Sequence, residues 1–310
     1  MAMILVTGIA GGLAQGVAER LVALGHDVVG VDYRPVQHLP EVLAERMPVY
    51  LANYNKTVIE NVFRKHAIER VLHLGRVGNL KESSRKRFDL NVIGSQKIMT
   101  LCEQHGIERV VVLSTFHIYG AEAANHIPIA EDEPLRAGIH YPQLADAIQL
   151  DNMSSSWAWK HPRSHVCVLR PTNVIGPHLR NTMSEVLRLR RIPRLVGYDP
   201  MMQFIYQDDL ADAVVAAATQ LSVGVFNVAG MGAIPWTTAA ECAGADGLWL
   251  PSPAVRLYAR LFSDIPAYLV NFLKYPCVIS DAPFRETFRW SPSVGIADSI
   301  TRTVATREPS

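Results

Sequence analysis

Short apolar runs rich in Val, Ile and Leu alternate with helical patterns through the first half of this 310-residue chain. Runs of this kind are typical of strands buried on both faces, and strands that alternate with helices form a parallel, doubly wound sheet. We expect strands within residues 3–8, 26–32, 47–53, 70–75, 109–115, 165–171 and 223–230. Ligands bind such a sheet at the carboxyl ends of its strands.

The alternation weakens after Pro177. The pattern predicts a Rossmann-type α/β domain over residues 1–176, to which residues 204–230 also contribute. Residues 177–203 and 231–310 are expected to form a smaller, mainly helical substrate cap.

Composition argues against several classes of protein. With 49% hydrophobic and 19% charged residues, the chain can bury a full core. The net charge is +1, and no Lys/Arg run is interleaved with aromatic residues, so no nucleic-acid partner is expected. No stretch reaches the roughly 20 apolar residues of a membrane span.

The cysteines and the N-terminus bear on location. No CxxC pair occurs among the four cysteines, Cys102, Cys167, Cys242 and Cys277, so neither a metal site nor a redox dithiol is expected. Free thiols of this kind predict a location in the reducing cytoplasm. The opening run MAMILVTG leads directly into a glycine turn and is interpreted as a first strand, not as a signal peptide.

The turn TGIAGGLAQG after the first expected strand is the clearest local signal. Gly8 and Gly11 occupy the first two positions of G-x-x-G-x-x-[GA], and Ala14 occupies the third. Glycine is needed because the backbone must approach a pyrophosphate on the helix N-terminus. Asp32, at the end of the next strand, can accept hydrogen bonds from the ribose of NAD; it repels the 2′-phosphate of NADP, which Arg34 could attract. NAD is favoured over NADP, the alternative being a glycine-rich turn without a ligand.

Several motifs in order resemble the extended short-chain dehydrogenase/reductase family, the NAD-dependent sugar epimerases and dehydratases. They are TGIAGGLA, LHLGRVG, NVIGS, LSTFHIYG, LRPTNVIGP, FIYQDDLADAV and VFNVAG. The resemblance implies a homodimer and further contacts. Those with the cofactor fall on Leu74, Arg76, Asn91, Arg170 and Pro171, and those with the substrate on His117 and Asn173.

The resemblance also implies the catalytic positions. In that family a Ser or Thr positions the substrate oxygen, and a Tyr transfers the proton. A Lys four residues later anchors the nicotinamide ribose and lowers the tyrosine pKa. Counting back from Gly120 places the hydroxyl at Thr115, and Tyr141 is the matching tyrosine. Ala145 then stands in place of the lysine.

The missing lysine has a calculable cost. A phenol with a pKa near 10 is about 0.1% ionised at pH 7. An ammonium about 5 Å away contributes roughly 3 kcal/mol at an effective dielectric constant of about 20, so its loss should reduce the tyrosinate roughly a hundredfold. Three explanations are open. Arg76, His117 or His140 supplies the cation; the protein binds a nucleotide without rapid turnover; or the alignment slips, although the next lysine, Lys160, is too distant.

Other charged residues receive simpler interpretations. Asp208 and Asp209 resemble a catalytic pair but are interpreted as caps of the following helix. Met202 and Gln203 stand where the family often has Arg-Asp, so an arginine for a nucleotide-sugar diphosphate is absent. Four arginines could compensate or could form a solvated face: Arg188, Arg190, Arg191 and Arg194.

Residues 255–276 carry large apolar side chains at helical spacing. We interpret them as a cover for the cap or for a dimer partner; a mouth for a lipid-like substrate or a membrane-surface contact is the alternative.

Two classes of function follow. In the first, the protein is an NAD-dependent epimerase, dehydratase or dehydrogenase. NAD then takes a hydride from a sugar-like or other hydroxylated substrate, Tyr141 takes the hydroxyl proton and Thr115 holds the oxygen. In the second, it senses or carries a nucleotide without turnover. We prefer the enzyme.

Overall fold

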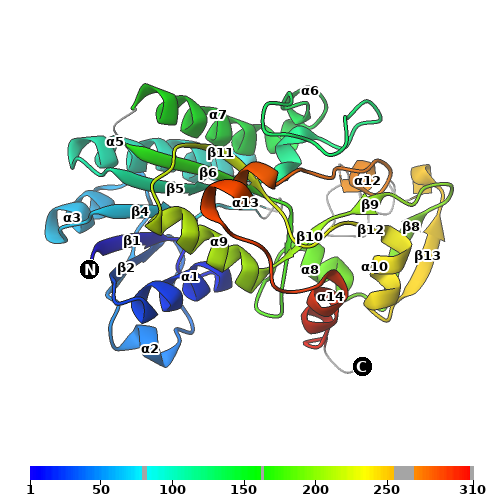
Figure 1. Ribbon diagram of the computed structural model, residues 1–310, viewed down its shortest axis with the longest axis horizontal. Helices are drawn as coiled ribbons and strands as arrows, with labels where there is room; N and C mark the ends of the chain where they lie inside the picture. Colours follow the sequence, from blue (N-terminus) through cyan, green and yellow to red (C-terminus); the bar gives the residue numbers. More distant parts are fainter. Residues whose placement is uncertain (79–81, 162–163, 255–268, 308–310) are drawn as a thin grey trace.

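A seven-stranded parallel sheet dominates the computed structural model, which describes residues 1–78, 82–161, 164–254 and 269–307 (Figure 1). The strand order is β11-β6-β5-β4-β1-β2-β3. The strands are β1 (Met3–Thr7), β2 (Asp27–Asp32), β3 (Val49–Leu51), β4 (Arg70–His73), β5 (Arg109–Leu113), β6 (His165–Pro171) and β11 (Gly224–Val228). Each expected run contains one of them, so the predicted doubly wound α/β fold is confirmed.

Helices cover both faces of the sheet (Figure 1). One face carries α1 (Gly12–Ala23) and α9 (Gln207–Thr219); the other carries α3 (Thr57–Lys65), α5 (Ser95–Gln104) and α7 (Ala145–Lys160). In β1, Ile4 and Val6 pack on the α1 side and Leu5 on the opposite side. Successive side chains of a strand point to opposite faces, which is why the apolar runs are continuous.

Shorter elements connect these layers. They are α2 (Glu41–Ala44), α4 (Ser84–Phe88), the π-helix η1 (Asp89–Gly94), the 3-10 helices η2 (Phe116–Tyr119) and η3 (Pro142–Leu144), and α6 (Ala137–His140). The chain runs without a break from α4 through η1 into α5.

The cap combines helices with small sheets. Its elements are β7 (Asn173–Ile175), α8 (Thr182–Leu187), β8 (Arg191–Leu195), β9 (Met201–Met202), β10 (Phe204–Tyr206), β12 (Ile234–Pro235), α10 (Trp236–Cys242), β13 (Asp246–Leu250), α12 (Leu269–Phe272) and α14 (Ile296–Val304). The pairs β8–β13 and β9–β12 add short sheets to the ranges 177–203 and 231–310, which were expected to be mainly helical, whereas β7–β10 joins two strands from the ranges expected in the larger domain. A separate apolar core forms there around the buried ring of Trp236.

One segment beyond residue 231 returns to the larger unit. Helix α13 (Ala282–Phe288) places Phe284 and Phe288 against Phe226 of β11, within the core of the main sheet. The chain thus crosses between the two units more often than the sequence-based boundaries assume. No helix in the described parts of the chain has the length and hydrophobicity of a membrane span.

Candidate functional site

The turn after β1 forms a tight backbone cradle at the start of α1. Gly8 has a positive φ of 81°, and a Cβ atom there would lie 2.7 Å from the Cα of Gly75. The Gly8 N–H donates to the carbonyl of Val31 at 2.8 Å, and the Gly11 N–H donates back to the Gly8 carbonyl at 2.9 Å. Position 8 therefore requires glycine both for its backbone angle and for space.

The Asp32 carboxylate fastens this turn to the end of β2. It accepts the backbone N–H of Ala10 at 2.9 Å and that of Arg34 at 2.8 Å. The guanidinium of Arg34 lies 3.5 Å from the same carboxylate, whose side chain is only 1% exposed. A carboxylate has about four acceptor positions, so Asp32 keeps capacity for ribose hydroxyls.

A cavity of about 110 Å³ opens at this end of the sheet. Its walls are Gly8, Gly11, Leu13, Ala14, Asp32, Tyr33, Arg34, Tyr54, Leu74, Gly75 and Arg76. Seven predicted cofactor residues meet there: Gly8, Gly11, Ala14, Asp32, Arg34, Leu74 and Arg76. A glycine cradle at a helix start, facing a carboxylate, fits the ADP half of a dinucleotide.

Four wall residues were not predicted: Leu13, Tyr33, Tyr54 and Gly75. Tyr54 follows β3, so its place after a predicted strand was the signal that could have found it. A larger hollow of about 550 Å³, lined by Phe63 to Ile68 and His105, lies beside segments that lead into β4 and β5. It is thus at the amino ends of strands, away from the end where ligands bind.

Two predicted cofactor residues have protein partners instead. Asn91 accepts the Val77 N–H at 2.8 Å and donates to the Val77 carbonyl at 3.0 Å, which holds the segment after Arg76. Arg170 is 4% exposed and makes a two-bonded ion pair with Asp151, at 2.6 and 3.0 Å. Burial alone would lower the pKa of Arg170, but the bonds and charge of Asp151 raise it.

The Arg170 guanidinium also donates to the hydroxyl of Tyr119 at 2.7 Å and to the carbonyl of Glu131 at 2.9 Å. The prediction of a cofactor contact through this side chain therefore does not fit the geometry. Pro171, the last residue of β6, is buried and pairs with Val228.

Thr115 follows β5 and begins η2. Its Oγ1 lies 2.9 Å from Nδ1 of His117 and accepts the His117 N–H at 3.4 Å. The ring of His117 packs against Phe116 and Phe272 at centroid distances of 4.3 and 4.9 Å. Burial, together with the charge of Arg76, lowers the pKa of His117 to about 3, so this histidine is neutral and a weak base.

Among the three candidate replacements for the lysine cation, only Arg76 belongs to the cavity wall. It is half-buried, and its charge acts on His117, which in turn bonds Thr115. His140 is exposed on α6, with its ring centroid 6.4 Å from that of Tyr141. His117 is neutral. Lys160 ends α7 and is exposed.

Tyr141 is buried and engaged with the protein. Its hydroxyl can donate to Glu122 Oε1 at 3.0 Å or to the Ala121 carbonyl at 3.1 Å, and it accepts from Asn271 Nδ2 at 2.9 Å. Burial raises the pKa of Tyr141 to about 12; the Asn271 hydrogen bond opposes this shift and the Glu122 carboxylate adds to it. This is the opposite of the shift that a proton-transferring tyrosine needs.

The spacing from Tyr141 to Ala145 is not helical. Tyr141 lies between α6 and η3, whereas Ala145 is the exposed first residue of α7. The α7 face that meets β5 is marked by Asp151, which accepts from Ser114 Oγ at 2.6 Å. One turn earlier on that face lies the buried Ala147. No lysine therefore occupies either position.

The predicted substrate contacts on the cap side are tied to backbone. Asn173 donates to the Gln203 carbonyl at 3.0 Å, and the Gln203 amide is paired with the backbone of Ile279. Arg188 donates to the carbonyls of Gly176, Pro177, Leu179 and Thr303, so it is not available for a diphosphate.

The remaining arginines do not share a helix. Arg191 and Arg194 lie on β8, Arg194 stacks over Trp249 at 5.5 Å, and Arg190 and Arg191 are exposed. The described end of the apolar stretch supplies Asn271 and Phe272, which contact Tyr141 and His117. Residues 255–268 lie outside the described part.

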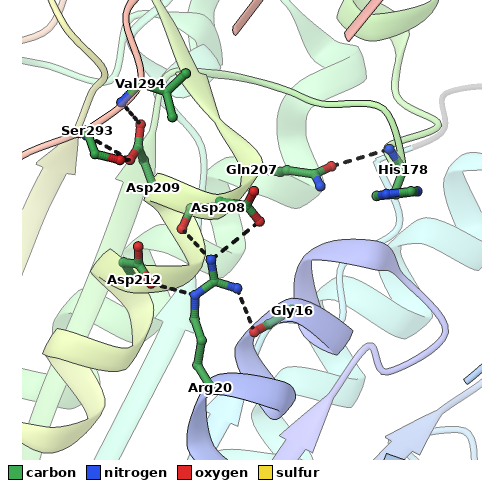
Figure 2. Close-up of polar contacts among 9 residues, drawn as sticks. All are labelled: Gly16, Arg20, His178, Gln207, Asp208, Asp209, Asp212, Ser293 and Val294. Atoms are coloured by element: carbon green, nitrogen blue, oxygen red, sulfur yellow. Dashed lines mark hydrogen bonds and ion pairs between the residues drawn. The ribbon is translucent and has the colours of Figure 1, made fainter. Parts of the chain in front are cut away.

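The acidic pair at the start of α9 connects this helix to α1 and to the segment before α14, as Figure 2 shows. Asp209 accepts three hydrogen bonds, from the backbone N–H and hydroxyl of Ser293 and from the Val294 N–H, at 2.7 to 3.1 Å. Asp208 pairs with Arg20 of α1 at 3.4 Å, and Asp212 pairs with the same guanidinium at 2.5 Å. Both aspartates lie in the first turn of α9, but no side chain caps this helix, so the predicted capping role is wrong and both instead bond other segments. The described residues contain no cluster of side chains that could hold a metal ion.

The chain is similar in sequence to known proteins. Residues 4–229 match the model of the NAD dependent epimerase/dehydratase family. An uncharacterised protein of Mycobacterium tuberculosis is 25% identical over 220 residues, which cover 70% of this chain and 54% of that protein. The chain thus spans about half the length of the first relatives that it matches. A UDP-glucose 4-epimerase of Pisum sativum is 26% identical over 70% of this chain and 72% of its own.

Solved structures share the fold. Pal from Bacillus thuringiensis superposes with a TM-score of 0.80 at 19% identity, covering 98% of each chain. The UDP-glucose 4-epimerase of Thermotoga maritima, solved with UDP-glucose, gives a TM-score of 0.77 at 20% identity, again over 98% of each chain.

Proposed function

Because the chain belongs to the NAD dependent epimerase/dehydratase family, we propose that it binds NAD and acts as an epimerase, dehydratase or dehydrogenase on a hydroxylated, sugar-like substrate. The observation that carries this proposal is the cavity in which the glycine cradle faces Asp32. Similarity to UDP-sugar epimerases supports the sugar-like class of substrate.

Each group at the site has a defined task in this proposal. NAD supplies the hydride acceptor. The amides of the turn from Gly8 and the start of α1 bind its pyrophosphate, and Asp32 accepts its ribose hydroxyls. Thr115, oriented by the neutral ring of His117, holds the substrate oxygen.

Arg76 is proposed to take over part of the missing lysine's task. It belongs to the cavity wall, and its planar guanidinium can donate to ribose or phosphate oxygens. Its charge also reaches the Thr115–His117 pair, since it lowers the pKa of His117. Tyr141 is proposed as the proton acceptor, and its raised pKa is expected to slow the proton transfer.

The state of Tyr141 favours a second candidate, a nucleotide-binding protein without rapid turnover. With a pKa of about 12, this phenol would be roughly 0.001% ionised at pH 7. The fraction is about a hundredfold below that of an unperturbed tyrosine. Slow chemistry is therefore expected even if every group is correctly placed.

Two measurements test the proposal in sequence. Calorimetric titration of nucleotide-stripped protein with NAD, NADH, NADP and NADPH should show binding of the NAD pair and weaker binding of the NADP pair. Single-turnover formation of NADH is then followed by absorbance with UDP-glucose and UDP-glucuronate. Activity that is lost in Thr115→Ala supports the enzyme. NAD binding without NADH formation supports the second candidate, and no binding of any of the four contradicts both.

The assembly and location stay predictions. A homodimer is expected from the family resemblance, and light scattering of the purified chain would test it. A cytoplasmic location and the lack of a nucleic-acid partner rest on the sequence, and a lipid-like substrate is a less favoured alternative.

A further inference from the structure

The phenol of Tyr54 is an unexplained part of the cavity wall. It lies in the loop between β3 and α3, is 1% exposed, and lines the cavity with Gly8, Gly75 and Asp32. Its hydroxyl is buried and has no hydrogen-bond partner in the described part of the chain. A buried hydroxyl without a partner destabilises a protein, so its retention in a wall calls for a reason.

Gly75 makes the room that this phenol occupies. A Cβ atom at position 75 would lie 2.1 Å from the Tyr54 hydroxyl oxygen and 2.7 Å from Cζ. The same Cβ would lie 3.0 Å from the amide nitrogen of Gly8. The hydroxyl therefore sits beside the phosphate cradle, at a point where only glycine can follow Leu74.

The polar groups nearest the hydroxyl are already used. The Gly8 N–H donates to the Val31 carbonyl, and Thr7 Oγ1 accepts the Gly75 N–H at 3.0 Å. Thr7 Oγ1 also lies 2.8 Å from Nδ1 of His73. Thr7 is the donor in that contact, because the direction of the hydrogen bonds from Thr7 through His73 to Ser95 is fixed at Ser95.

Ser95 sets the direction of this series of hydrogen bonds. Its hydroxyl donates to the Asn91 carbonyl at 2.7 Å, so it must accept from His73 Nε2, also at 2.7 Å. Burial lowers the pKa of His73 to about 4, so the ring is neutral and its Nδ1 is an acceptor for Thr7. Thr7, His73 and Ser95 thus have partners of their own; Thr7 Oγ1 keeps one acceptor lone pair, but the Tyr54 hydroxyl makes no hydrogen bond of normal geometry to it.

We propose that the Tyr54 hydroxyl donates a hydrogen bond to a ribose or phosphate oxygen in the ADP half of the dinucleotide, and that Gly75 is a glycine to admit this phenol. The inference rests on the proposed binding of NAD. Acceptors of this kind are what the ADP half presents to a cradle of backbone amides. Tyr54 is therefore a binding residue of the cavity.

Tyr54→Phe tests the donor because it keeps the ring and removes only the hydroxyl. Wild type and variant are titrated by calorimetry with NAD, ADP-ribose and nicotinamide mononucleotide. One lost hydrogen bond should lower the affinity for both NAD and ADP-ribose about 2- to 12-fold. Tyr50→Phe is the matched control, since the Tyr50 hydroxyl bonds His66 outside the cavity; its affinities should equal those of wild type.

Stability of the ligand-free protein separates a ligand contact from a structural one. Removing an unpaired buried hydroxyl should leave the urea midpoint of Tyr54→Phe unchanged or higher. A fall in affinity with no loss of midpoint supports the inference. If the wild type binds NAD and Tyr54→Phe binds it equally well, the inference about Tyr54 is overturned while the proposed function stands. A lower midpoint overturns it, because the hydroxyl would then serve the fold; a wild type that binds no dinucleotide overturns both.

Gly75→Ala tests the spatial half of the inference. In wild type the new methyl group collides with the phenol, so both the urea midpoint and the affinity for ADP-ribose should fall. In a Tyr54→Leu background the same substitution should cost much less, because the hydroxyl and Cζ are gone. Equal losses in the two backgrounds would show that Gly75 does not serve Tyr54.

Discussion

At the scale of single residues, Tyr141 shows how partners decide the role of a side chain. Its position in the sequence matches a proton-transferring tyrosine, yet Glu122 and Asn271 hold its hydroxyl and burial raises its pKa to about 12. A negative carboxylate beside a phenol opposes loss of the phenolic proton. The ionised form is therefore scarce at neutral pH.

This predicts an unusual pH dependence. If Tyr141 is the base, the single-turnover rate of NADH formation should rise about tenfold per pH unit from pH 7 to pH 9, since the tyrosinate fraction grows until the pH reaches the pKa. Tyr141→Phe should remove the rise, with affinity for NAD unchanged. A rate that levels off near pH 7, or that survives the substitution, would show that another group accepts the proton.

Arg76 is the second residue whose position invites a test. Arg76→Gln removes the cation from the cavity wall while retaining hydrogen-bonding capacity. We expect affinity for NAD to fall about 10-fold or more, as for loss of a charged hydrogen bond. His140→Gln is the control, because His140 is exposed on α6. Equal affinities for wild type and Arg76→Gln would remove Arg76 from the site.

At the scale of elements, helix α7 is fixed by charge as well as by packing. Asp151 of α7 bonds Ser114 after β5 and Arg170 of β6, and its side chain is fully buried. Helix, strand and the segment that carries Thr115 are thus held by one carboxylate. A buried pair of this kind depends on both partners.

Loss of that carboxylate should therefore be costly. Asp151→Asn is expected to lower the free energy of unfolding by about 3 kcal/mol, because Arg170 would keep a buried charge without a counter-ion. Glu82→Gln is the control: its pair with Lys86 is largely exposed, with side chains 34% and 46% accessible, and should contribute only about 0 to 1 kcal/mol. Urea denaturation compares the two; similar losses would contradict a special role for Asp151.

The geometry of α7 also predicts a negative result. Ala145 lies six residues before Asp151, which places it on a different side of the helix, and it is exposed. Ala145→Lys should therefore leave the pH profile of NADH formation and the urea midpoint unchanged. A lysine at this position that moved the profile toward neutral pH would show that Tyr141 and position 145 do share a site.

At the scale of the whole molecule, features set by neighbouring residues could be predicted from the sequence, whereas features set by contacts between distant segments could not. The seven strands and the Gly8 turn were predictable, because burial on both faces and a tight backbone leave a signature in neighbouring residues. The environment of Tyr141 was not, since Asn271 comes from α12, far along the chain. The return of Phe284 and Phe288 to the main core escaped prediction for the same reason.

Two neutral histidines, the buried His73 and the half-buried His117, tie the stability of the whole fold to pH. Burial lowers the pKa of His73 to about 4, and burial with the charge of Arg76 lowers that of His117 to about 3. A histidine in the unfolded chain has a pKa near 6.5. Below that pH, His73 and His117 are therefore protonated in the unfolded chain but remain neutral in the folded protein. Stability is fully present above about pH 6.5 and is lost as the pH falls toward 4.

The size of the effect follows from linkage. Each histidine contributes up to about 1.4 kcal/mol per pH unit, so the two together should lower the free energy of unfolding by roughly 3 to 4 kcal/mol between pH 7 and pH 5. Urea denaturation at pH 7.5, 6.0 and 5.0 measures it. His117→Asn should halve the slope, whereas His178→Asn, at an exposed position, should not change it. A free energy of unfolding that stays constant down to pH 5 would mean that these rings accept protons in the folded state. The hydrogen bonds that connect Thr7, His73 and Ser95 would then open more readily than their distances indicate.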